Sequence, residues 1–193
     1  MKKSRHVVFR MVALTLLLMA GQPVRARDGA GFWVRSPHGQ RAMVVFPLSR
    51  ALPDPRLTRG AINPAVTQAT LRETICRRGG YTRSIRPPER YTEELKRRQI
   101  REYGYRDRRL RDFEEDHLIS LELGGSPDSP RNLWPEPRRV VDGWGSYAKD
   151  RLEDRLHWMV CHGRIALSQA QYLIAHDWIA AYRRYIGSAP DVH

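Results

Sequence analysis

Residues 113–137 read FEEDHLISLELGGSPDSPRNLWPEP, and this stretch decides the fold. Apolar and polar side chains alternate well enough from Phe113 to Leu123 to predict a β-strand. The glycine- and proline-rich run from Gly124 to Asp128 predicts a turn, because these residues favour tight backbone reversals. Residues 132–134 then return as the second arm. The stretch therefore predicts a β-hairpin.

Helices are predicted on both sides of this hairpin. Residues 91–103 have helical spacing of their apolar side chains, with Thr92 as N-cap and Gly104 as stop. A second helix begins at Ser146 and runs to about Val160, and a third spans residues 168–185 with a core-like apolar face. The predicted fold class is therefore α+β, a hairpin plus a helix, with additional flanking helices.

The N-terminus has the pattern of an export signal. Basic residues precede an apolar run at residues 11–20, and Val24-Arg25-Ala26 matches the small-x-small site of a signal peptidase. The run is shorter than the ~20 residues of a membrane span, so we expect no stable membrane insertion after cleavage, with an uncleaved anchor as the open alternative. We predict a signal peptide over 1–26, a periplasmic or secreted protein, a partly disordered extension over 27–68 and one domain over 69–187.

The chain of 193 residues carries a formal net charge of +13. Residues 1–26 contribute five positive charges and no negative ones, so the mature chain would keep +8. A positive field favours encounter with polyanions such as nucleic acid, anionic lipid or acidic polysaccharide, without specifying which.

Only two cysteines are present, Cys76 and Cys161, one on each side of the central hairpin. In an exported chain two cysteines most simply pair, so we predict a structural disulfide. Their spacing makes a poor zinc site, with Cys161-His162 as a weak exception.

The residues that carry chemistry are Asp116, His117 and Asn132, followed by an acidic helix. Phosphodiester hydrolysis needs a base that activates water and a group that takes up charge on the phosphoryl oxygens. Neighbouring side chains on a strand point to opposite faces, so Asp116 and His117 can share one centre only where the strand ends or bends. Asp116 would then bind a divalent ion, and His117 would accept the proton of the water.

DHLISLELGG at 116–125 and RNLWPEP at 131–137 resemble the HNH branch of the His-Me finger nucleases. The flanking TICRRGGYTRSIRPP, KRRQI, KDRLEDRLHWMVCHG and AQ…IA.DW segments resemble a group of small exported bacterial proteins with this domain. The resemblance implies a ββα-metal core of hairpin plus helix. It also implies His117 as general base, Asp116 as metal ligand, and Asn132 as the residue that fixes the hairpin and orients the histidine.

The sequence departs from the family pattern at its third position. The family usually places His or Asn on the helix soon after the central asparagine, where this chain has Val140-Val141. Asp150, Glu153 and His157 share one face of the predicted helix, and we favour Asp150 or Glu153 as the further metal ligand. Oxygen ligands favour Mg or Mn, with Ca, Ni and Zn left open. Glu114 shares the strand face of Asp116 and is the better candidate of its acidic pair for tuning the metal site.

The leading functional prediction is a metal-dependent endonuclease that hydrolyses phosphodiester bonds in DNA, with RNA left open, at low sequence specificity. We expect a monomer. The sequence leaves open an inhibitor protein as a further partner. The alternative is a noncatalytic extracytoplasmic binder of nucleic acid or other polyanions with a degenerate site. The cations expected to contact phosphates are Lys96, Arg97, Arg98, Arg101 and Lys149.

Overall fold

The structure is a computed structural model that describes residues 32–34 and 43–190. The predicted signal peptide and part of the predicted extension lie outside the described residues. Among the helices of the described part, none has the length and apolar character needed to cross a membrane.

The predicted hairpin is present and lies at the centre of the fold. Strand β3 (Phe113–His117) pairs antiparallel with β4 (Leu133–Pro137), with His117 opposite Leu133 and Glu114 opposite Glu136. A second antiparallel pair joins β1 (Phe32–Val34) to β2 (Met43–Val45). The structure is thus mixed, with small antiparallel sheets and several helices, and the predicted α+β class is confirmed at that level.

Strand β3 is shorter than the sequence predicts. It ends at His117, where the chain bends and continues into a short 3-10 helix, η3 (Leu121–Leu123). The backbone beyond the bend bonds to Asn132 and to the turn instead of continuing the β-ladder. The other short 3-10 helices are η1 (Leu48–Arg50), η2 (Leu110–Asp112) and η4 (Val141–Gly143).

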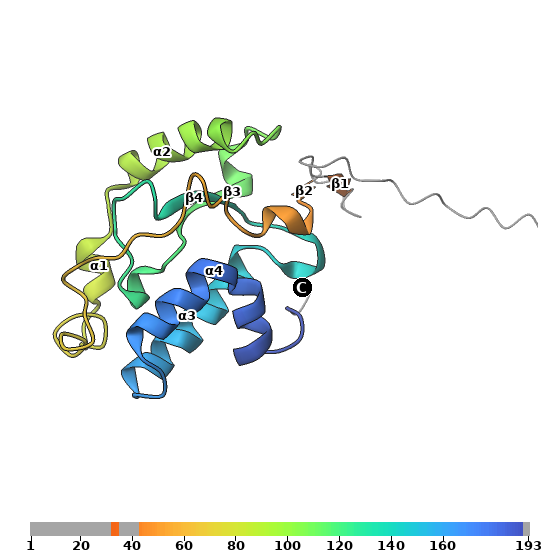
Figure 1. Cartoon of the computed structure of the whole chain (residues 1–193). Coiled ribbons are helices and arrows are strands. Elements are labelled where there is room, and N and C mark those ends of the chain that lie inside the picture. Colours follow the sequence, from red (N-terminus) through yellow and green to blue (C-terminus); the bar gives the residue numbers. More distant parts are fainter. Residues whose placement is uncertain (1–31, 35–42, 191–193) are drawn as a thin grey trace, which may run out of the picture.

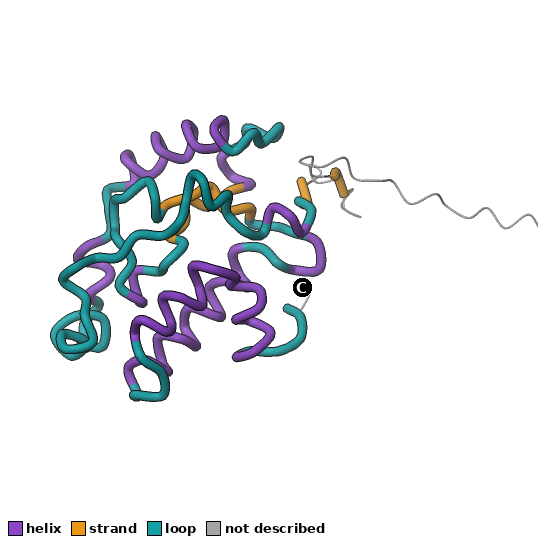
Figure 2. Tube along the Cα trace, in the orientation of Figure 1, coloured by secondary structure: helices purple, strands orange, loops and turns teal. Residues whose placement is uncertain are grey.

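Helices cover the hairpin from two sides (Figure 1). The basic helix α2 (Glu89–Glu102) lies on one side, preceded by the short α1 (Tyr81–Ile85). Helices α3 (Ser146–Cys161) and α4 (Leu167–Tyr185) pack against each other on the other side, as the tube in Figure 2 also shows. Each predicted helix is found within a few residues of its predicted bounds.

One helix start and one helix interior differ from the prediction. Helix α2 begins before Thr92, whose hydroxyl donates to the carbonyl of Glu89 inside the first turn instead of capping it. Helix α4 is interrupted at Asp177, whose backbone leaves the helical region while its carboxylate accepts a hydrogen bond from the amide of Ala180 at 2.9 Å. That contact is an N-cap, so Asp177 restarts the helix after the bend.

The segment before residue 69 packs more tightly than predicted. Val44, Phe46, Ala51 and Val66 are buried in the same core as the helices. The indole of Trp178 donates to the carbonyl of Ala51 at 2.8 Å. Residues 44–68 are therefore part of the packed unit and not a loosely attached extension, because their apolar side chains fill space that the hairpin and helices leave open.

The predicted disulfide is confirmed. Cys76 and Cys161 are bonded, with their Cα atoms 5.5 Å apart. Residues 71–76 form turns. The disulfide therefore ties a turn-rich segment to the C-terminal end of α3.

Candidate active site

Asn132 fixes the loop between the two strands of the hairpin. It is fully buried, and its side-chain amide donates to the carbonyls of Ile119 at 3.0 Å and Ser126 at 2.9 Å. Its side-chain oxygen accepts from the amide of Ile119 at 3.0 Å. One side chain thus satisfies three backbone groups across the loop, which a buried loop needs to avoid unpaired polar atoms. None of these hydrogen bonds reaches His117, so the effect of Asn132 on the ring passes through the loop.

His117 is held by that same loop. Its Nε2 lies 2.8 Å from the carbonyl oxygen of Pro127. Because a carbonyl can only accept, Nε2 carries the proton and Nδ1 carries the lone pair. Burial lowers the pKa of His117, although the neighbouring Asp116 acts in the opposite direction. The ring is therefore kept neutral, in a defined tautomer, with a nitrogen that can accept a proton.

Lys149 occupies the space between the hairpin and α3. Its side chain is completely buried, and its ammonium bonds to Asp116 Oδ2 at 2.5 Å, to the carbonyl of His117 at 2.8 Å and to the carboxylate of Glu153. Glu136 Oε2 lies 4.0 Å away. The ammonium predicted to contact a phosphate thus faces inward and not toward solvent, with carboxylates and a carbonyl as its partners.

The carboxylates around Lys149 outnumber it three to one, counting Asp116, Glu136 and Glu153. Burial raises the pKa of Glu136 well above its usual value and that of Glu153 to about 8, against the attraction of Lys149. Burial also pushes the pKa of Asp116 upward, but Lys149 outweighs it and holds that pKa below its usual value. Asp116 is therefore ionised and pairs with Lys149, whereas Glu136 and Glu153 bind a proton more readily than ordinary glutamates.

Sequence reasoning missed Glu136. It is 1% exposed, and neither of its carboxylate oxygens has a hydrogen-bond partner among the described residues. Its position opposite Glu114 in the hairpin was the available signal, since paired residues share a face of the sheet.

The three predicted metal ligands do not converge. Glu153 is bound to Lys149, whereas Asp150 is exposed on the first turns of α3. Although the residue as a whole is exposed, partial burial of its carboxylate and the negative charges of Asp116 and Glu114 together raise the pKa of Asp150 to about 6, against the attraction of Lys149. Among the described residues, the one group of three ligand-type side chains with ligand atoms within 4.8 Å of one another lies elsewhere, at the disulfide. Glu114 forms an ion pair with Arg138 at 2.7 Å.

Glu115 lies next to the site and was not predicted as buried. Both oxygens are inaccessible and lack a hydrogen-bond partner among the described residues. Burial raises its pKa to about 9, although Lys96 lowers it. Glu115 is thus protonated at neutral pH and adds no negative charge beside His117.

The predicted basic face of α2 is only partly available. Lys96 is buried, with 9% of its side chain exposed, and pairs with Glu93 at 2.5 Å, so it is not a free surface cation. Arg97 and Arg98 are about half exposed and form longer ion pairs on the same helix. Arg101 is exposed. The arginines of this face remain accessible to a polyanion.

No known protein-family profile, curated protein or solved structure matches this chain.

Proposed function

We propose that this protein is a metal-dependent nuclease with the ββα arrangement of the HNH enzymes and His117 as its general base. The observation that carries the proposal is the position of His117 at the end of β3, with its Nε2 fixed by the Pro127 carbonyl and its loop fixed by Asn132. A base for hydrolysis must be neutral and held in one tautomer, and both conditions are met here.

In the proposed reaction Nδ1 of His117 accepts a proton from water as the water oxygen attacks the phosphorus of a phosphodiester. The bond from phosphorus to the leaving oxygen then breaks, and the leaving oxygen takes a proton from solvent water. The products are a phosphate monoester and an alcohol, and His117 returns its proton to the solvent. Lys149 positions the site rather than reacting, because its ammonium holds the Asp116 carboxylate and the His117 carbonyl in a fixed relation.

The residues present fit a hard divalent ion such as Mg or Mn in donor type and charge. Asp116 and Asp150 are the carboxylates that would hold it. In this structure Asp116, like Glu153, is bonded to Lys149, so a bound ion would have to replace the ammonium at the Asp116 carboxylate. One or two carboxylates with water and substrate phosphate are a usual Mg environment. Burial and the negative charges of Asp116 and Glu114 raise the pKa of Asp150. Lys149 therefore does not fully neutralise the negative charge around this carboxylate. A bound ion would stabilise charge on the phosphoryl oxygens.

The test is cleavage of supercoiled plasmid by the oxidised protein, with EDTA and with Mg or Mn restored. We expect EDTA to stop cleavage and His117→Ala to lower it by at least ~100-fold, the usual contribution of a general base. His176→Ala is the matched control, because His176 is exposed on α4 and bonds to the carbonyl of Tyr172 in its own helix. Unchanged cleavage by His117→Ala would remove His117 from the mechanism.

One observation favours a second function, a noncatalytic binder of polyanions. The completely buried Lys149 already supplies a cation to Asp116 and Glu153, as in a structural ion-pair cluster. Absence of cleavage with every metal, together with DNA binding that weakens steeply with salt, would favour this function over the nuclease.

A further inference from the structure

We propose that reduction of the Cys76–Cys161 disulfide creates a zinc site formed by the two cysteines and His157. The sulfur atoms and a ring nitrogen of His157 already lie within 4.8 Å of one another. Ligands of one tetrahedral zinc ion lie roughly 3.5 Å apart, so small side-chain rotations would bring the three together. The site shares no residue with the His117 cluster and does not depend on the proposed nuclease.

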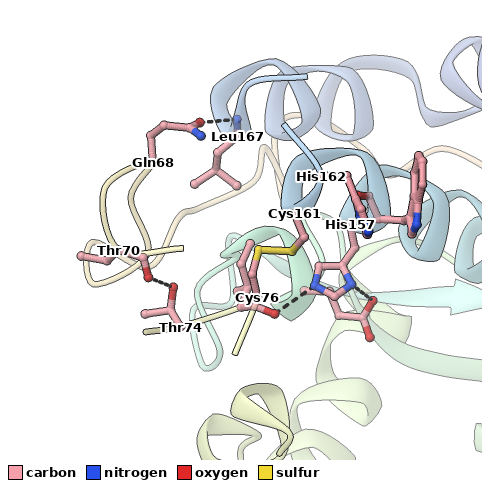
Figure 3. Close-up of a disulfide and its surroundings, with 11 residues drawn as sticks. Gln68, Thr70, Thr74, Cys76, His157, Cys161, His162 and Leu167 are labelled. Carbon is pink, nitrogen blue, oxygen red and sulfur yellow. Dashed lines mark hydrogen bonds and ion pairs between the residues drawn. A yellow bond between two sulfur atoms is a disulfide. The ribbon is translucent and has the colours of Figure 1, made fainter. Parts of the chain in front are cut away.

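The backbone places the ligands on two elements. His157 and Cys161 are one helical turn apart on α3, so their side chains share a face. Cys76 comes from the turn-rich segment that crosses the end of this helix, as Figure 3 shows. In the oxidised protein the sulfurs are bonded to each other and cannot act as thiolate ligands.

The environment of His157 is that of a metal ligand. Its Nε2 lies 2.9 Å from the carbonyl of Ile75, the residue before Cys76, and must donate to it. Zinc-bound histidines commonly donate their second nitrogen to a backbone carbonyl in this way. The other ring nitrogen of His157, Nδ1, lies 3.6 Å from Glu122 Oε2. Glu122 is therefore the candidate fourth ligand.

The disulfide is accessible to a reductant. Both cysteines are half-buried and line a cavity of about 470 Å³ together with Gln68, Leu71 and Arg72. A dithiol can attack one sulfur there. The two cysteines gain two electrons and two protons, and the dithiol is oxidised to its own disulfide. Zinc then displaces the two thiol protons as it binds.

The experiment compares zinc binding by oxidised and reduced protein. The protein is reduced with dithiothreitol, freed of it under nitrogen, and titrated with Zn²⁺ against a chromophoric chelator. We expect one zinc ion per reduced chain, bound at least ~100-fold more tightly than by the oxidised chain, because thiolates supply most of the affinity. Co²⁺ in place of zinc should give the intense spectrum of a tetrahedral thiolate site.

Two variants test the assignment of His157. His157→Gln should weaken zinc binding to the reduced chain by at least about tenfold. His162→Gln should bind as the wild type does, because His162 stacks on Trp158 and bonds to its carbonyl. Far-UV circular dichroism follows folding with and without zinc. Equal affinity of oxidised and reduced protein, wild-type affinity of His157→Gln, or a reduced chain that stays unfolded in zinc would each overturn the proposal.

Discussion

Lys149 is completely buried in the candidate site, with three carboxylates within 4.0 Å of its ammonium. Burial alone would lower the pKa of a lysine, yet Asp116, Glu153 and Glu136 together raise that of Lys149 well above its usual value. The ammonium is thus charged under all ordinary conditions. Its removal would leave three buried or half-buried carboxylates without a cation, which is far more costly than the loss of a surface pair.

We therefore expect Lys149→Met to lower the free energy of unfolding by about 3–5 kcal/mol. The loss should be larger at pH 8 than at pH 5. Without the ammonium the pKa values of Glu136 and Glu153 rise further above those of the unfolded chain, and the pKa of Asp116 is no longer held below its usual value. The folded state then binds more protons and loses stability as pH rises. Urea unfolding at both pH values measures this.

Lys96→Met is the matched control for this variant. Lys96 is also buried, but its ion pair is with Glu93, whose side chain is 31% exposed. Loss of that pair should cost no more than about 1 kcal/mol. Equal losses for the two variants, or a Lys149→Met loss that is the same at both pH values, would contradict the role assigned to Lys149.

At the scale of elements, the loop between β3 and β4 determines where His117 points. Gly125 lies against the backbone of Ile119, and a Cβ at this position would overlap the Ile119 carbonyl and approach the Asn132 amide within 2.7 Å. Gly125 lies this close because Ile119 and Asn132 form the hydrogen bonds that hold the loop.

We expect Gly125→Ala to lower the free energy of unfolding by about 2–4 kcal/mol, because it forces the backbone apart and unpairs buried groups. Plasmid cleavage should fall with it, since the Pro127 carbonyl that fixes His117 belongs to the same loop. Gly187→Ala is the control, because no atom lies within 4 Å of an added Cβ there. Chemical denaturation and the cleavage assay measure both effects, and wild-type stability of Gly125→Ala would contradict the packing argument.

The hairpin and the helices could be predicted from sequence because they follow local rules. Alternation, turn residues and helical periodicity act over a few neighbours. The end of β3 at His117 could not be predicted by local rules, because it depends on Asn132, which closes the loop from the other strand. The burial of residues 44–68 likewise depends on contacts with α4, such as the bond from Trp178 to Ala51.

The candidate site was predictable in its hairpin residues and less so on its helix. The pattern around Asp116 and His117 was enough to select them as candidate residues, but it did not show that the strand ends at His117. On α3 the sequence does not distinguish which of Lys149, Asp150 and Glu153 faces the hairpin. The packing of the helix against the hairpin decides this: it turns Lys149 inward and leaves Asp150 exposed. Periodicity gives the face of a helix but not its rotation against a neighbour.

At the scale of the whole molecule, the disulfide joins a segment without helix or strand to the C-terminal end of α3. Residues 69–80 contain no described helix or strand, and the bond between Cys76 and Cys161 spans a separation of 85 residues. A cross-link over so long a loop restricts the unfolded chain strongly and so stabilises the folded state.

The double variant Cys76→Ser/Cys161→Ser should therefore lose roughly 3–5 kcal/mol of the free energy of unfolding. Urea unfolding in EDTA, which keeps zinc from the thiols, compares it with the oxidised wild type. Reduced wild type is the control that separates the missing bond from the new hydroxyls, and it should lose a similar amount. A loss below about 1 kcal/mol in both would contradict this account, because a cross-link that restricts the unfolded chain must show its effect when it is removed.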